Sequence, residues 1–182
     1  MGKVAFLFTL AIIGTSNTVE SLEQGSCQPG FLMFAGNKCL HVSIGYYLNH
    51  SVSWITTWDE ARERCMAMSD DIWTSDLAYS INEDTLYQFN DYIANNQTGM
   101  RGLVFWVGAF KINTVSQWEW TDGQLVDSMS YVWNAGEPAE SSTGTRGVLV
   151  PANSHRFYMI SQTNTSHAPS FICEAAPKCD RE

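Results

Sequence analysis

The sequence has few charged residues, and most of those it has are acidic. Charged side chains make up 16% of the 182 residues, and 19 acidic against 10 basic side chains give a formal net charge of −9. Such a chain is repelled by nucleic acid and by anionic membrane surfaces, so neither is an expected partner. Aromatic residues reach 13%, a balance that is typical of a compact domain with an aromatic core.

Long apolar runs are also scarce. Residues 4–13 form one, which follows Lys3 and precedes the small residues 14–16. That order is typical of a secretory signal peptide, which we expect to occupy residues 1–20. A membrane anchor is the alternative, but a run of about ten residues is much shorter than the roughly 20 that span a bilayer. We therefore expect a secreted, extracellular protein with no membrane span, and three glycosylation sequons agree with export, at Asn49, Asn96 and Asn164.

Motifs for catalysis and for zinc binding are absent from the sequence. It has no G-x-S-x-G, no H-E-x-x-H and no glycine-rich phosphate loop. No CxxC pair or Cys/His spacing resembles a zinc site, and the four histidines are scattered without a partner motif. We therefore predict a binding protein and not an enzyme.

Cysteine is sparse, and its number is odd. An exported protein folds in an oxidising compartment, so the five cysteines are candidates for disulfides: Cys27, Cys39, Cys65, Cys173 and Cys179. Cys27 and Cys39 are close enough in sequence to staple a short hairpin that turns at Gly36 and Asn37. Two bridges would leave one cysteine for an intermolecular bridge or a free thiol.

Two helices are indicated in the first half of the chain. Thr57 and Glu60 have the spacing of a capping box, and a stripe at helical spacing follows, formed by Trp58, Ala61, Cys65 and Met68. Cys65 should therefore point into the core. A second helix begins near Asn82, with acidic residues in its first turn, and its buried stripe consists of Leu86, Phe89 and Ile93.

From residue 103 onward the pattern is that of strands. Residues 103–110 form a nearly continuous apolar run, as expected for a strand buried on both faces. Residues 118–120 alternate, and short strands are predicted at 147–150, 157–160 and 170–174. Residues 46–55 and 124–146 read as loops, and the length of the second marks it as functional. The predicted class is α+β.

Six sequence fragments, in order, resemble motifs of the C-type lectin-like domain family. They are TWDEARERC, SDLA, FWVGAF, WEWTDG, WNAGEP and FICE. The resemblance covers residues 27–175 and leaves 176–182 as a short tail. It implies a disulfide-stapled fold of two helices and short antiparallel sheets with a long loop region. It also implies that Trp106 packs in the core and does not contact a ligand.

The family resemblance also implies how the cysteines pair. Cys65 should bond to Cys173, and Cys27 to Cys39, which is the additional hairpin bridge of the family's long form. Cys179 is then unpaired, or it joins two chains as a homodimer. A further inner disulfide, usual in the family, is missing, because the aligned positions hold Gly147 and about Thr165.

A second departure concerns calcium. Sugar-binding members hold Ca²⁺ through a Glu-Pro-Asn tripeptide around a cis proline, a downstream Glu and an Asn-Asp pair, and sugar hydroxyls complete the shell. Here the tripeptide is Glu137-Pro138-Ala139, Thr145 replaces the downstream Glu, and residues 156–158 hold no carboxylate. Arg156 adds positive charge nearby. Ca²⁺ is the candidate cofactor, and we expect its usual site to be degraded.

The remaining polar residues of the long loop region are the candidates for contact. Glu137 and Asn153 are the candidate metal ligands, and the candidate sugar contacts are Glu137, Glu140 and Asn153. The resemblance implies a secreted carbohydrate-binding lectin that recognises glycans or glycoconjugates, including those on microbial surfaces. Small secreted members of this kind are typical of innate immunity in invertebrates. The alternative is a C-type lectin-like domain that binds a protein or another non-sugar ligand without calcium.

Overall fold

The computed structural model describes residues 27–35, 37–44, 47–48, 51–52, 56–96, 103–113, 116–138, 143–153, 156–168 and 170–178. The expected signal peptide and the residues Asn49, Glu140 and Cys179 lie outside this part of the chain, and only the backbone of Asn96 and Asn153 is described. No helix in the described part is long and apolar enough to cross a membrane.

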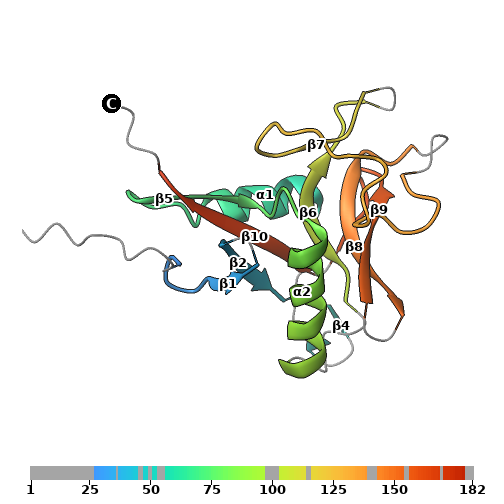
Figure 1. Ribbon diagram of the computed structural model, residues 1–182. Helices are drawn as coiled ribbons and strands as arrows, with labels where there is room; N and C mark the ends of the chain where they lie inside the picture. Colours follow the sequence, from blue (N-terminus) through green and yellow to red (C-terminus); the bar gives the residue numbers. More distant parts are fainter. Residues whose placement is uncertain are drawn as a thin grey trace, which may run out of the picture.

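Most of the described strands form one twisted sheet (Figure 1). Its eight strands are β1 (Leu32–Phe34), β2 (Lys38–Ser43), β5 (Trp73–Leu77), β6 (Phe105–Phe110), β7 (Glu119–Trp120), β8 (Arg146–Asn153), β9 (Arg156–Gln162) and β10 (Ser170–Pro177). The main order is β1-β2-β10-β6-β8-β9, with β5 beside β10 and β7 beside β6. The β6–β10 pair is parallel, and the other pairs are antiparallel.

The segment expected to be a loop at 46–55 contains a small hairpin of its own. It consists of β3 (Tyr47–Leu48) and β4 (Ser51–Val52), which pair with each other and not with the main sheet. The prediction of a loop was therefore wrong for these four residues, because strands of two residues are too short to show an alternating pattern.

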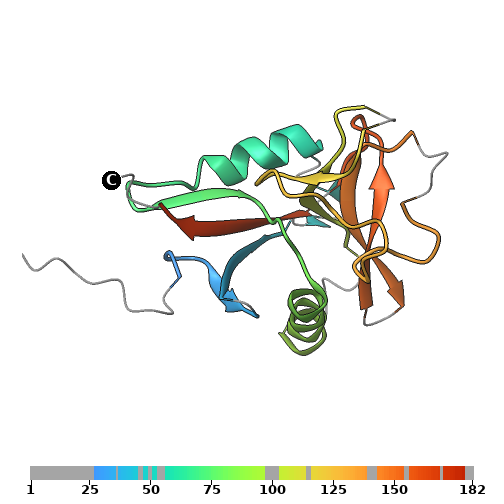
Figure 2. The ribbon, with the colours of Figure 1, turned by 45° about the horizontal axis from the view of Figure 1, so that its top comes forward.

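Both helices begin where the sequence signals predicted. In α1 (Trp58–Met66), the Glu60 amide donates to Thr57 Oγ1 at 3.3 Å and the Thr57 amide donates to Glu60 Oε2 at 2.9 Å, which completes the capping box. Before α2 (Glu83–Asn96), Asn82 Oδ1 accepts from the Thr85 amide at 2.9 Å. Figure 2 shows the two helices on opposite sides of the ribbon formed by β5 and β10.

Strand β6 separates two apolar cores, as its continuous apolar run predicted. Phe105 and Val107 pack in the core that contains the buried stripe of α2. Trp106 packs in the other core with Trp58 and Cys65 of α1. The indole N–H groups of both tryptophans are satisfied, because Trp106 Nε1 donates to the Thr56 carbonyl at 2.9 Å and Trp58 Nε1 donates to the Val107 carbonyl at 2.7 Å.

Both predicted disulfides are present. Cys27 bonds to Cys39 across the β1–β2 hairpin, and Cys65 of α1 bonds to Cys173 of β10. The second bridge spans 108 residues, and closing a loop of that size stabilises the fold by roughly 4 to 5 kcal/mol on the chain-entropy account. It lies within the core that contains Trp106.

The position of the missing inner disulfide has no room for a cysteine. Gly147 lies on β8, opposite Ser161 of β9. A Cβ atom at Gly147 would stand 2.7 Å from the Ala109 Cβ of β6, closer than any ordinary contact between carbon atoms. β6 and β8 thus approach each other closely where the family usually has a bridge.

A buried ion pair on the α2 side links two strands and the segment that follows β5. Lys38 Nζ of β2 donates to Glu174 Oε1 of β10 at 2.6 Å and to the Tyr79 carbonyl at 3.0 Å, and the Tyr79 amide donates to Glu174 Oε2 at 3.0 Å. Burial raises the pKa of the Glu174 carboxyl, although Lys38 acts in the opposite sense. Burial and the nearby carboxylates raise the pKa of Tyr79 to about 12.

Removing one member of this pair should cost more stability than removing both. In Glu174→Leu the ammonium of Lys38 stays largely buried without its counter-charge, and we expect a loss of about 3 to 5 kcal/mol in the free energy of unfolding. In the double variant Lys38→Met/Glu174→Leu the loss should be smaller, because no unpaired charge is left. Urea denaturation of the wild type, both single variants and the double variant tests this. A double variant that is less stable than Glu174→Leu would contradict the expectation.

Candidate functional site

The long loop between β7 and β8 is fixed to β9 by backbone hydrogen bonds. The Met159 amide donates to the Val132 carbonyl at 2.7 Å, and the Asn134 amide donates to the Met159 carbonyl at 2.9 Å. Trp133, which lies between Val132 and Asn134 in the sequence, is buried, and its indole N–H donates to the Asp127 carbonyl at 3.1 Å. This stretch of the loop therefore has a defined shape.

Glu137 forms a second attachment of the loop to β9. Its Oε2 atom accepts from the amide of Ser161 at 3.2 Å and from the Ser161 hydroxyl at 2.7 Å. Its own amide donates to the Asn134 carbonyl at 2.9 Å, and the Glu137–Pro138 peptide bond is cis, the form in which sugar-binding members of the family hold this proline. The carboxylate that the sequence singled out as a candidate ligand thus holds the loop in place.

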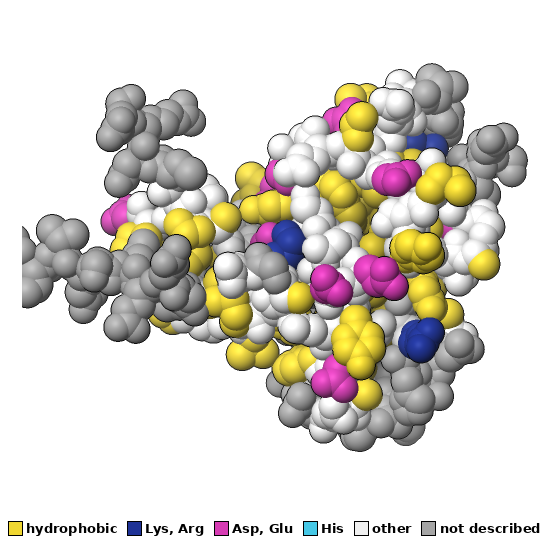
Figure 3. Space-filling view, viewed as in Figure 1, with side chains coloured by type: hydrophobic (Ala, Val, Ile, Leu, Met, Phe, Trp, Pro, Cys, Tyr) yellow, Lys and Arg dark blue, Asp and Glu magenta, His cyan; other side chains and the backbone are white. Residues whose placement is uncertain are grey.

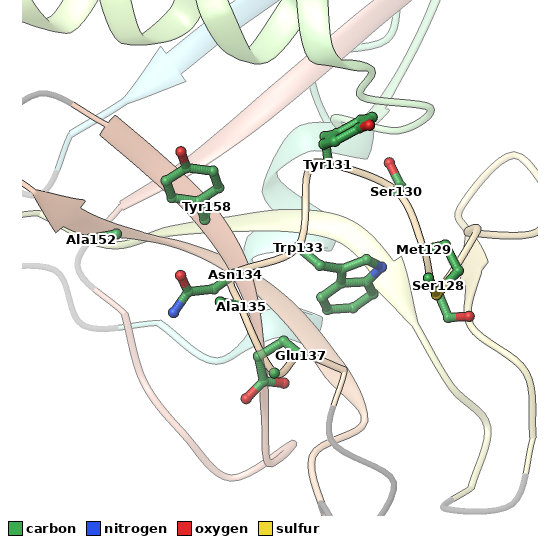
Figure 4. Close-up of a pocket in the computed structure, with 11 residues that line it drawn as sticks. Ser128, Met129, Ser130, Tyr131, Trp133, Asn134, Ala135, Glu137, Ala152 and Tyr158 are labelled. Atoms are coloured by element: carbon green, nitrogen blue, oxygen red, sulfur yellow. The ribbon is translucent and has the colours of Figure 1, made fainter.

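A cleft of about 800 Å³ lies over this loop. Figure 4 shows Trp133 between the two tyrosines, Tyr131 and Tyr158, on one side and Glu137 on the other. The residues that line it include Ser128, Met129, Tyr131, Asn134, Glu137 and Tyr158. Met129 and Tyr131 are 85% and 77% exposed. The cleft therefore presents aromatic faces, hydroxyl groups, one amide and one carboxylate.

The structure brings some of the predicted site residues to the cleft. Glu137 lines it. Ala152, directly before Asn153 on β8, also lines it, while Asn153 is not among the lining residues and Glu140 lies outside the described residues.

The lining residues that were not predicted from the sequence include Asn134, Tyr131 and Tyr158. Asn134 lies within the WNAGEP motif but was not singled out, and Tyr131 lies in a loop without periodicity. Tyr158 had a readable signal, because it alternates with the buried residues Phe157 and Met159 on β9 and so must point away from the core.

The described side chains do not fit the family's calcium ion, which needs six to eight oxygen ligands. No group of three or more His, Cys, Asp or Glu gathers in the described part of the chain. Thr145 stands at the place of the downstream Glu. Its carbonyl accepts from the Lys111 amide, its amide donates to the Gln162 carbonyl, and its hydroxyl accepts from Arg146 Nη1. Phe157, at the place of the Asn-Asp pair, packs edge-on against Phe89 and Phe105 with ring centroids 5.4 and 5.5 Å away.

Comparison with solved structures places this fold among C-type lectins. Human lithostathine is 18% identical over 88% of this chain and 97% of its own, with a TM-score of 0.64. The C-type lectin CEL-I from Cucumaria echinata is 19% identical over 84% and 99%, with a TM-score of 0.61. A calcium-independent type II antifreeze protein is 19% identical over 84% and 96%, with a TM-score of 0.60. No protein-family model and no curated protein matches the chain.

The protein is thus a small disulfide-bonded domain of the α+β class. Its fold is the C-type lectin-like fold, as the six motifs implied. A lectin and an antifreeze protein both have this fold, so the ligand has to be inferred from the site and not from the architecture.

Calcium should not stabilise this protein. A ligand present at 100 times its dissociation constant adds about 2.7 kcal/mol to the free energy of unfolding, which would raise the melting temperature by several degrees in a domain of this size. We expect millimolar calcium to leave the melting temperature within about 1 °C of the value in chelator, because the part of the chain that the structure describes holds no cluster of carboxylates. Magnesium serves as the control for ionic effects. A rise specific to calcium and reversed by chelator would disprove this prediction.

Proposed function

We propose that the protein is a secreted lectin that binds carbohydrate in the long-loop cleft without calcium. The observation that carries the proposal is the placement of Tyr131 and Tyr158 in the same cleft as Asn134. A sugar ring has an apolar C–H face that packs on an aromatic ring, and its hydroxyls need hydrogen-bond partners. A cleft that offers both is suited to such a ligand.

Free polar groups in the cleft are available to sugar hydroxyls. The side-chain amide of Asn134 makes no hydrogen bond to the described residues, and Ser128 is exposed. An amide supplies two donors and an acceptor oxygen, and a hydroxyl group supplies both functions. Both groups can therefore form hydrogen bonds with the hydroxyls of a sugar held in the cleft.

Export and the class of glycan are also part of the proposal. Two disulfides favour an oxidising compartment, which agrees with the signal peptide expected at residues 1–20. The sequon residue Asn164 is exposed in the turn after β9, where a glycan can be attached. We take glycans of microbial surfaces as the partner class, with a role in innate immunity.

A second candidate function is the binding of a protein or another non-sugar ligand. It is favoured by the exposed apolar side chains Leu125 and Met129, which lie on the same loop as Tyr131. Neighbouring exposed apolar groups of this kind are characteristic of interaction surfaces.

A glycan array probed with calcium and again with chelator separates these alternatives. We expect glycan binding that survives chelation. Binding that chelator abolishes would show that calcium takes part, contrary to the proposal. If the folded protein binds no glycan under either condition, the proposal is wrong and a non-sugar ligand is favoured.

Replacing Tyr131 tests where the sugar binds. Tyr131→Ala should lower the affinity for the best array glycan about tenfold, or roughly 1.4 kcal/mol, because the stacking face is lost. Tyr131→Phe keeps that face and should retain most of the affinity. Ile112→Ala is the matched control, since Ile112 is 76% exposed and lines no part of the cleft. If Tyr131→Ala and the wild type bind the glycan with equal affinity, the sugar binds elsewhere on the protein.

A homodimer through Cys179 is a separate proposal. Four of the five cysteines are engaged in the two disulfides, which leaves Cys179 for a bond between chains. Electrophoresis of the secreted protein without reductant should show a band of twice the monomer mass that disappears on reduction. The band should also be missing in Cys179→Ser. A monomer band alone in the wild type would rule out the covalent dimer.

A further inference from the structure

A second hollow adjoins the long-loop cleft. It has a volume of about 300 Å³ and shares two lining residues with the cleft, Tyr131 and Tyr158. Its remaining walls come from α2, which contributes Glu83, Tyr87 and Asn90, and from Arg156 at the start of β9. The two hollows therefore meet at the pair of tyrosines, and one ligand of two or more linked rings can occupy both.

Arg156 is the positive charge of this second hollow. Two other arginines form ion pairs within the protein: Arg62 pairs with Asp76, and Arg146 pairs with Asp59. Arg156 is exposed and forms no ion pair with any described residue. Its guanidinium group can therefore bind a ligand without first giving up an internal partner.

Asn90 and the tyrosines complete the chemistry of the second hollow. Asn90 Oδ1 accepts from the Phe157 amide at 2.7 Å, which fixes the orientation of the side chain and leaves its NH₂ group as a donor. Tyr87 is 72% exposed and offers an aromatic face. Donors and aromatic faces are thus grouped around Arg156, and Glu83 adds one acceptor for hydroxyl groups.

We propose that the second hollow binds an acidic sugar residue, one that carries a carboxylate or a sulfate group, next to the sugar held in the cleft. This inference rests on the proposed function. The planar guanidinium of Arg156 would bind the acidic group through two parallel hydrogen bonds, which is the geometry that arginine and such oxyanions share. The ring of the acidic sugar would pack on Tyr131 or Tyr87.

The charge around the hollow makes this recognition depend on the whole ligand. The chain carries a formal net charge of −9, and on the face shown in Figure 3 basic side chains are sparse among the acidic ones. A small free anion is repelled by this surface. An acidic group that is covalently attached to a sugar bound in the cleft is presented to Arg156 at high effective concentration.

The test compares acidic glycans with their neutral counterparts. A glycan array carries matched pairs, among them tetragalacturonate with its methyl ester and sulfated N-acetyllactosamine with its unsulfated parent. The wild type should prefer the acidic member of at least one pair about tenfold. Arg156→Gln should abolish that preference and leave the affinity for the neutral member within about twofold. Raising the salt concentration should weaken the binding of the acidic glycans and leave the binding of the neutral ones unchanged.

Two further variants serve as controls. Arg64→Gln removes the same charge from the exposed surface of α1 and should leave the acidic preference intact. Arg156→Lys keeps the charge but loses the planar fork, so part of the preference should remain.

Each outcome decides one of the two claims. If neutral and acidic glycans bind equally and Arg156→Gln changes neither, the acidic subsite is wrong while the lectin function stands. If the acidic preference is lost equally in Arg64→Gln, it comes from net charge and not from this hollow. If no glycan binds at all, the proposed function fails and the subsite with it.

Discussion

The burial of β6 on both faces is the constraint on which the rest of the structure depends. Phe105 and Val107 pack toward α2, and Trp106 packs toward α1 and the Cys65–Cys173 bridge. A strand in this position cannot shift by one residue, because every side chain would then change sides. Its register in turn fixes β8, whose residues Leu149 and Val148 lie opposite Phe105 and Trp106.

The β8–β9 hairpin links the position of the long-loop cleft to that of β6. Phe157 and Met159 of β9 point into the core and Tyr158 points into the cleft, while the backbone of Met159 and the side chain of Ser161 hold the long loop. The family usually secures this region with an inner disulfide. Here that position is closed by the close approach of Gly147 to Ala109, so the loop is held by hydrogen bonds, which are insensitive to reduction but, unlike a disulfide, do not constrain the unfolded chain.

The sequence predicted features that depend on short-range patterns. The capping box of α1 and the apolar run of β6 were read from neighbouring residues, and the family resemblance supplied the Cys65–Cys173 pairing. The predicted strand at 147–150 was too short, because β8 runs from Arg146 to Asn153 and its last three residues, which include a proline, show no alternation. The cleft was harder to predict: Tyr131 belongs to a loop whose position comes from backbone hydrogen bonds to β9, and such bonds leave no trace in the pattern of side chains.

The departures from the calcium-binding pattern are physically consistent with one another. A calcium site gathers carboxylates whose mutual repulsion is costly unless the ion is present. In this chain Phe157 occupies the place of the family's Asn-Asp pair and packs against Phe89 and Phe105. Glu137, the carboxylate that is kept, accepts hydrogen bonds from Ser161. Because the described residues hold no cluster of carboxylates, Arg156 lies beside the cleft without an adjacent acidic cluster to neutralise it. The same substitutions therefore agree with the proposed function, in which stacking, hydrogen bonds and the charge of Arg156 take the place of metal coordination.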